Sequence, residues 1–203
     1  MRRHLAFVFW LALAVASDIS HGSLSPRSAS ATTVVELSVA DLVSMSTLVL
    51  AGTPLESRSL WEDSAGGRGR RIVTYTRVRV DRMVDGDPKA EVWVRTLGGQ
   101  VDDIGQHVDG EAVLVSQRPV LLFLRGLADG THAVVGMAQG QYPIEAGPGG
   151  SEPKLMTPPG MGRLVARTGA FAKNELPARL ALSGQSLDVA SRLVLAERRA
   201  HAR

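Results

Sequence analysis

The densest group of polar side chains in the sequence lies between Asp102 and Glu111. Within it His107, Asp109 and Glu111 occupy alternate positions, which share one face if the segment is a strand. Oxygen ligands together with one imidazole could hold a divalent cation. The spacing matches no calcium-binding loop, and no second histidine is nearby. We therefore expect a solvated loop and no cofactor, and keep a metal site at these three residues as the alternative.

Groups suited to nucleophilic catalysis are sparse. The sequence has no cysteine and no Gly-x-Ser-x-Gly motif. Beyond the first residues the histidines that could act as bases are His21, His107, His132 and His201, of which the first and last fall in predicted tails. A serine triad built on His107 or His132 is compatible with the sequence, because triad members need not be neighbours along the chain. We predict no catalytic residues.

Other polar motifs are interpreted as solvated loops. The acidic pairs Glu62-Asp63 and Asp102-Asp103 have no surrounding motif. The glycine-rich segments 66–69 and 147–150 lack the Lys-Ser/Thr ending of a phosphate-binding loop. These segments therefore predict solubility and flexibility in place of chemistry.

Two alternating segments, 71–81 and 90–97, carry the aromatic and basic residues of a candidate binding face. They are predicted to form the two strands of a hairpin that is joined by the turn 85–89. Alternation points one set of side chains outward, namely Tyr75, Arg77, Arg79, Trp93 and Arg95. Trp, Tyr and Arg are enriched in binding hot spots, so we predict a surface for a protein or a glycan. In the alternative, a C-terminal helix packs over these aromatic side chains, or arginine stems cover the rings.

The elements that must position this face are mainly strands. Short apolar or alternating segments separated by Gly, Pro and Asp turns follow one another from residue 47 to residue 144, including 48–54, 113–115, 120–124, 132–138 and 141–144. About six such strands at this spacing favour a β-barrel or sandwich. The core is expected to include Val49, Val78, Val80, Val92, Val94, Leu122 and Leu124.

Helices are expected only at the two ends of this β region. Ser38 can cap a short helix within residues 36–43, with Asp41 three positions later. Ser186 can cap a second helix at about 187–199, whose apolar residues form one stripe and whose arginines lie near its C-terminal end. The predicted organisation is a signal peptide at 1–16, a linker at 17–32, a β-barrel domain at 33–146, a Pro/Gly-rich linker at 147–162 and a C-terminal tail at 163–203.

The first sixteen residues have the layout of a signal peptide. Basic residues at positions 2 and 3 precede the apolar run 5–16, which ends in Ala14-Val15-Ala16. That run is shorter than the roughly 20 residues of a membrane-spanning helix. We therefore expect cleavage after Ala16, export to the periplasm or the medium, and no stable membrane insertion afterwards. The absence of cysteine rules out disulfides, so an apolar core must stabilise the exported chain.

Charge gives no indication of a nucleic-acid partner. Removal of residues 1–16 leaves 21 basic and 20 acidic residues, a net charge of +1. The computed isoelectric point of about 9.8 therefore reflects arginines that stay charged at high pH, and not a surplus of positive charge at neutral pH. Arginine far outnumbers lysine, which is typical of GC-rich coding sequences and favours a bacterial source.

Three segments of the β region resemble those of a known family. The strands at 48–52, 78–86 and 120–124 are similar in apolar spacing and turn glycine to netrin-like domains and tissue inhibitors of metalloproteinases, which are OB-type barrels. The resemblance covers about residues 36–146 and implies a small OB/netrin-like β-barrel. Those inhibitors present an N-terminal cysteine to the protease metal, and with no cysteine in this chain the mechanism does not carry over. The chain also resembles uncharacterised secreted proteins of GC-rich bacteria.

Together these features predict an exported, non-catalytic β-barrel module that binds an extracytoplasmic protein or polymer. One alternative is a secreted hydrolase or metal-dependent enzyme centred on His107, Asp109 and Glu111. Another is a structural component of the cell envelope.

Export predicts a new N-terminus. Mass spectrometry of the exported protein should find the chain beginning at or near Ser17, because the small residues at 14–16 form the cleavage site. Recovery of the chain with Met1 intact in the membrane fraction would contradict this prediction.

Overall fold

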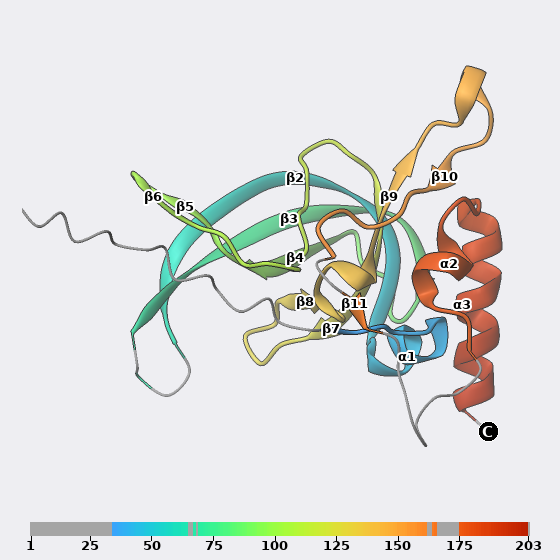
Figure 1. Ribbon diagram of the computed structural model, residues 1–203, viewed down its shortest axis with the longest axis horizontal. Helices are drawn as coiled ribbons and strands as arrows, with labels where there is room; N and C mark the ends of the chain where they lie inside the picture. Colours follow the sequence, from blue (N-terminus) through green and yellow to red (C-terminus); the bar gives the residue numbers. More distant parts are fainter. Residues whose placement is uncertain (1–33, 65–66, 68, 162–163, 166–174, 203) are drawn as a thin grey trace, which may run out of the picture. The chain divides into compact units, whose positions relative to one another are not determined.

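The computed structural model describes residues 34–64, 67, 69–161, 164–165 and 175–202 (Figure 1). The predicted signal peptide at 1–16 and the linker at 17–32 lie outside these residues. The described elements are mainly strands, in agreement with the predicted class. In chain order they are β1 (Val34–Val35), α1 (Val39–Met45), β2 (Leu48–Asp63), β3 (Arg70–Asp85), β4 (Glu91–Leu97), β5 (Gly99–Val101), β6 (Ile104–Gln106), β7 (Val120–Gly126), β8 (His132–Val134), a 3₁₀ turn (Met137–Gly140), β9 (Gln141–Glu145), a second short 3₁₀ segment (Pro148–Gly150), β10 (Lys154–Leu155), β11 (Leu164–Val165), α2 (Ala178–Leu182) and α3 (Leu187–His201).

Seven strands form the main sheet, in the order β10-β9-β7-β2-β3-β4-β8. A further pairing joins β8 back to β7, so the pairings of β7, β2, β3, β4 and β8 run in a cycle. Neighbouring strands are antiparallel except β4 and β8, which are parallel where Val94 lies opposite His132. β5 and β6 form a separate two-stranded hairpin, and β1 pairs with β11. The hairpin falls where the sequence indicated only a bend and a loop.

β2 and β3 are longer than the sequence predicted. β2 continues through Pro54 to Asp63, where a break was expected at the proline. Its pairing with β7 ends at Gly52, and the register against β3 shifts between Pro54 and Ser57. Beyond Gly52 the strand has only one ladder, and proline is tolerated at such edges and bulges because its missing N–H breaks no second ladder. The pair Glu62-Asp63 therefore lies in a strand, and not in a loop.

The two predicted helix caps are confirmed. Ser38 begins α1 with a capping box, in which the Asp41 amide donates to Ser38 Oγ at 3.1 Å and Asp41 accepts from the Ser38 amide at 2.9 Å. Ser186 begins α3 and accepts from the Val189 amide at 3.4 Å. Both helices start where a short polar side chain satisfies amides that lack a helical partner.

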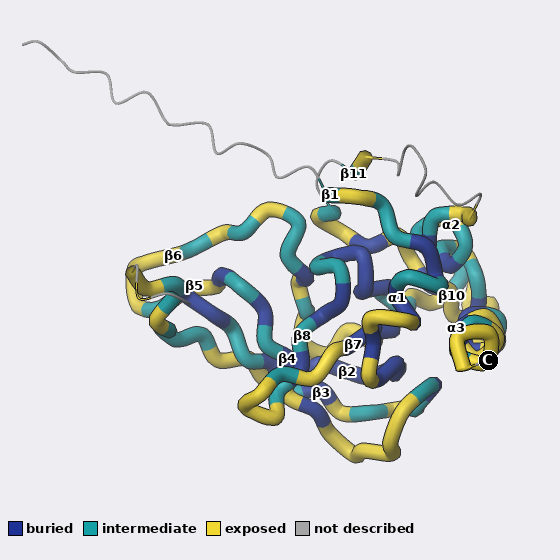
Figure 2. The backbone as a smooth tube through the Cα atoms, turned by 90° about the horizontal axis from the view of Figure 1, so that it is seen from below, coloured by how far each residue is buried: buried dark blue, intermediate teal, exposed yellow. Residues whose placement is uncertain are grey.

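Two apolar clusters cover opposite faces of the strands β2 and β7. The first lies between the sheet and the helices and includes Val49, Leu121 and Phe123 from the strands together with residues of α1, α2 and α3. The second is enclosed by the curved sheet and includes Leu48, Leu50, Val78, Val92, Val94, Leu122 and Leu124. The buried residues in β7, β2 and α1 are visible in Figure 2. The predicted core is confirmed for six of its residues, whereas Val80 is half-buried at the edge of the second cluster.

The chain after residue 146 belongs to the same core as the strands. Leu155, Leu182, Ala190 and Val194 are all fully buried in the first cluster. Arg198 donates from Nε to Asp85 at 2.7 Å and from Nη2 to the Ser46 carbonyl at 2.9 Å, which joins α3 to the end of β3. The predicted boundary at 146 therefore does not separate the β region from a tail, and α1, α2 and α3 lie together at one end of the sheet (Figure 1).

None of the helices in the described part of the chain combines the length and the apolar character that crossing a bilayer requires.

The packing of α3 predicts a contrast between two adjacent aliphatic residues. Val194→Ala should lower the free energy of unfolding by about 1–3 kcal/mol, because the side chain is fully buried. Leu195→Ala should change it by less than about 0.5 kcal/mol, because Leu195 is 40% exposed. Urea unfolding of both variants measures the difference. Equal, small effects would show that α3 does not belong to the core.

Candidate functional site

The hairpin of β3 and β4 places the predicted face on one side of the sheet. Tyr75 lies opposite Arg95, Arg77 opposite Trp93, and Arg79 opposite Glu91. Residues directly opposite one another in an antiparallel pair share a face and are in contact. The intervening residues Thr76, Val78, Val92 and Val94 are buried on the other face.

Tyr75 and Arg95 are held by a carboxylate from the neighbouring strand β2. The Tyr75 hydroxyl donates to Glu62 Oε1, and Arg95 forms an ion pair with Glu62 and donates from Nε at 3.2 Å. Hydrogen bonding to Arg95 lowers the pKa of Glu62, and burial raises the pKa of Tyr75. The Arg95 side chain is only 15% exposed. These three residues therefore form a partly buried polar contact that joins β2 to β4, and they offer little surface to a partner.

Arg77 and Arg79 are also paired within the chain. Arg77 lies between two carboxylates, with Nε 3.0 Å from Glu56 and Nη1 3.2 Å from Glu91. Arg79 Nε lies 2.8 Å from Asp81. The face therefore has balanced charge, although the sequence indicated a basic one.

Trp93 is the exposed apolar residue of this face. Its side chain lies in the middle of β4 and is 41% exposed, directly opposite Arg77. α3 packs against α1 and the first apolar cluster, so it does not cover Trp93 as the alternative prediction required. A large aromatic side chain surrounded by held arginines is an arrangement suited to contact with a partner.

The acidic segment does not assemble a catalytic or metal centre. His107 Nε2 lies 3.2 Å from Asp109, but both side chains are largely exposed, at 83% and 66%. Glu111 instead accepts from the Ala112 amide at 3.0 Å, and burial raises its pKa. Within the described ranges no three His, Cys, Asp or Glu side chains are grouped as metal ligands would be.

The same region lines a small cavity of about 290 Å³ with both polar and apolar walls. Hydroxyls of β3 and β4 form one wall, and Glu111 and His107 also border it, whereas Asp109 and His132 do not. His132 is buried in β8, and this burial lowers its pKa. Among the described residues, His132 therefore does not join His107 and Glu111 in one cavity, as a catalytic site built on these side chains would require.

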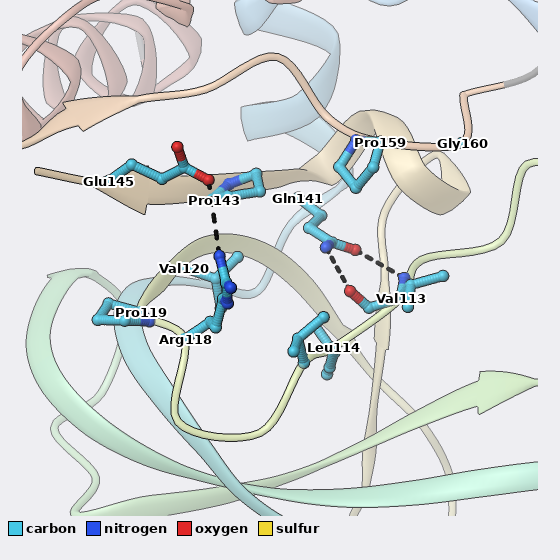
Figure 3. Close-up of a pocket in the computed structure, with 11 residues that line it drawn as sticks. Val113, Leu114, Arg118, Pro119, Val120, Gln141, Pro143, Glu145, Pro159 and Gly160 are labelled. Atoms are coloured by element: carbon cyan, nitrogen blue, oxygen red, sulfur yellow. Dashed lines mark hydrogen bonds and ion pairs between the residues drawn. The ribbon is translucent and has the colours of Figure 1, made fainter.

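A second cavity, of about 460 Å³, is mainly apolar and was not predicted (Figure 3). Its walls come from three parts of the chain, namely 113–120, β9 and the segment around Pro159. Gln141 anchors one wall: its amide accepts from the Val113 N–H at 2.9 Å and donates to the Val113 carbonyl at 2.6 Å. Arg118 and Glu145 lie beside each other at 4.0 Å. The sequence predicted a strand at 113–115, but the close approach of residues so far apart in the chain depends on the fold.

Comparison with protein-family models and with curated protein sequences yields no significant match.

The polar contact at Glu62 predicts a pH-dependent loss of stability. Glu62→Gln should lower the free energy of unfolding by about 1–3 kcal/mol at pH 7, because Arg95 and Tyr75 lose a charged acceptor. Because the folded state lowers the pKa of Glu62, this stabilisation is complete above the unfolded-state value of about 4.3 and is lost as the pH falls through the folded-state pKa. The difference between wild type and variant should therefore shrink in acid.

Glu91→Gln is the matched control for this prediction. Glu91 is 43% exposed and pairs with Arg77 at the surface, so its substitution should cost less than about 1 kcal/mol. Chemical unfolding between pH 3 and pH 7 measures both variants. A Glu62→Gln effect that is as small as that of Glu91→Gln, or independent of pH, would contradict the assignment.

Proposed function

We propose that this protein is an exported, non-catalytic binding module that contacts a protein or polymer outside the cytoplasm through the face around Trp93. The observation that carries the proposal is the 41% exposed tryptophan in the centre of β4. Its neighbour Arg77 is held in place by Glu56 and Glu91. A preorganised surface loses less conformational entropy on binding than a mobile one, so these held side chains favour recognition.

An OB-type barrel of the netrin-like kind is the proposed architecture. The cycle of pairings through β7, β2, β3, β4 and β8 supports it, because the OB-fold is a five-stranded, partly open barrel. Helices at both ends of the chain that share one apolar cluster with the strands fit a barrel covered on one side. Fold alone assigns no activity, so the argument for binding depends on the exposed face.

Export is proposed from the N-terminal sequence. The basic start, the apolar run and the small residues at 14–16 support cleavage and transfer to the periplasm or the medium. The high share of buried aliphatic residues in two clusters is consistent with a cysteine-free chain that is stabilised by packing alone.

The proposed face predicts that Trp93→Ala abolishes partner capture and leaves the melting temperature nearly unchanged. Much of the side chain already contacts solvent, so its removal costs little stability, whereas hot-spot tryptophans contribute about 2 kcal/mol or more to binding. The measurement is affinity capture from envelope and secreted fractions of the producing organism with tagged mature protein, together with thermal unfolding.

Ile104→Ala is the matched control, because Ile104 is 56% exposed on β6 and lies outside the face. It should retain capture. A loss of stability in Trp93→Ala would show that the ring is part of the core. Unchanged capture in both Trp93→Ala and Arg77→Ala would place the binding surface elsewhere.

A further inference from the structure

The segment from Ala112 to Val115 has the pattern of a strand but no neighbouring strand. Ala112 is buried and Leu114 packs against the second apolar cluster, whereas Val113 and Val115 are 52% and 51% exposed. This alternation of buried and exposed residues is typical of a strand, which the sequence predicted at 113–115. The structure leaves the segment outside every sheet.

A side chain replaces the missing strand at one residue. The amide of Gln141 both accepts from the Val113 N–H and donates to its carbonyl, which is the exchange that a facing residue makes in an antiparallel pair. At the next residue the main chain is unpaired: among the described residues no hydrogen bond uses the N–H or C=O of Leu114, which in an extended segment point to the edge opposite that of Val113. An extended peptide can add as a strand and form hydrogen bonds with unpaired main-chain groups of this kind.

The same residues border the apolar cavity shown in Figure 3. Val113, Leu114 and Val115 form one wall, and Val120 and the rings of Pro119, Pro143 and Pro159 contribute most of the remainder. A volume of about 460 Å³ can receive one or two apolar side chains. Apolar surface beside unpaired main chain is the combination that strand-adding peptides use for specificity and affinity.

The charges at the cavity favour a peptide over a fatty acid. Arg118 and Glu145 are 69% and 52% exposed and lie 4.0 Å apart, so each remains accessible to a further partner. A fatty acid has one carboxylate, which can pair with Arg118 but leaves Glu145 without a partner from the ligand, and its hydrocarbon chain cannot bond to the Leu114 main chain. A peptide can supply both charges and main-chain hydrogen bonds.

We propose that the apolar cavity and the segment 112–115 together bind an extended apolar segment of a partner protein, with one apolar side chain in the cavity and main-chain hydrogen bonds to the N–H and C=O of Leu114. This site goes beyond the Trp93 face, with which it shares no lining residue. Binding at one surface does not require binding at the other.

The proposal can be tested with a phage-displayed library of random peptides of about nine residues, selected against the full mature protein. We expect enriched peptides that share an apolar residue and that bind Val115→Glu at least about tenfold more weakly, because the variant places a charge at the cavity. Ile104→Glu, with a comparably exposed aliphatic residue on β6, should bind as wild type does. Trp93→Ala should also bind normally, which separates this site from the proposed function.

Amide signals in a ¹⁵N-labelled sample provide the second readout. Addition of an enriched peptide should shift the amide signals of Leu114 and its neighbours and slow the hydrogen exchange of the Leu114 amide. The proposal is overturned if no peptide is enriched relative to selection on Val115→Glu, or if enriched peptides shift other amides only. Saturable binding of sodium laurate that displaces the peptide would assign the cavity to an acyl chain. Sedimentation showing a dimer that Val115→Glu dissociates would assign the segment to a second copy.

Discussion

Both faces of the β2–β7 strand pair are buried, and the remainder of the fold follows from the need to cover them. Alternate residues of β2 enter different clusters: Val49 faces the helices, while Leu48 and Leu50 face the inside of the curved sheet. A strand with two apolar faces is stable only between two layers. The three helices supply one layer, and the curvature that brings β4 and β8 round to β7 supplies the other. The pairing of β2 with β7 ends at Gly52, where β3 approaches so closely that a Cβ would lie 2.5 Å from the Arg79 carbonyl.

The candidate binding surfaces lie where this coverage stops. The helices of the described residues pack on the first apolar cluster, and the arginines on the outer side of β3 and β4 pair with carboxylates of β2, β3 and β4, which leaves Trp93 exposed. The apolar cavity lies between the segment 113–120, which includes residues outside every sheet, and β9 of the main sheet. Both surfaces are therefore products of long-range packing, and both are built on residues that the sheet holds in place.

Local features of the sequence predicted a large part of the architecture. Ser38 and Ser186 act on amides three residues away, so the caps and starts of α1 and α3 follow from sequence alone. The turn at 85–89 and the alternation beside it predicted the β3–β4 hairpin and the outward set of residues. The pairing of Tyr75 and Arg95 with Glu62 was not predicted, because Glu62 belongs to a strand that the sequence appeared to break at Pro54. The role of α3 in the core and the unpaired segment 112–115 were also missed, since each depends on contacts between distant parts of the chain.

The central claim is that the β region and the C-terminal helices form one cooperative structure with two covered faces. The most direct measurement is thermal unfolding, followed by near-ultraviolet circular dichroism, of a mature chain truncated after Ala146. Truncation removes Leu155, Leu182 and Val194, which exposes one face of the β2–β7 pair. The account predicts that the truncated chain shows no cooperative thermal transition and no near-ultraviolet circular dichroism signal from immobilised aromatic side chains. A sharp transition close to that of the full mature chain would show that residues up to 146 fold on their own, and would contradict it.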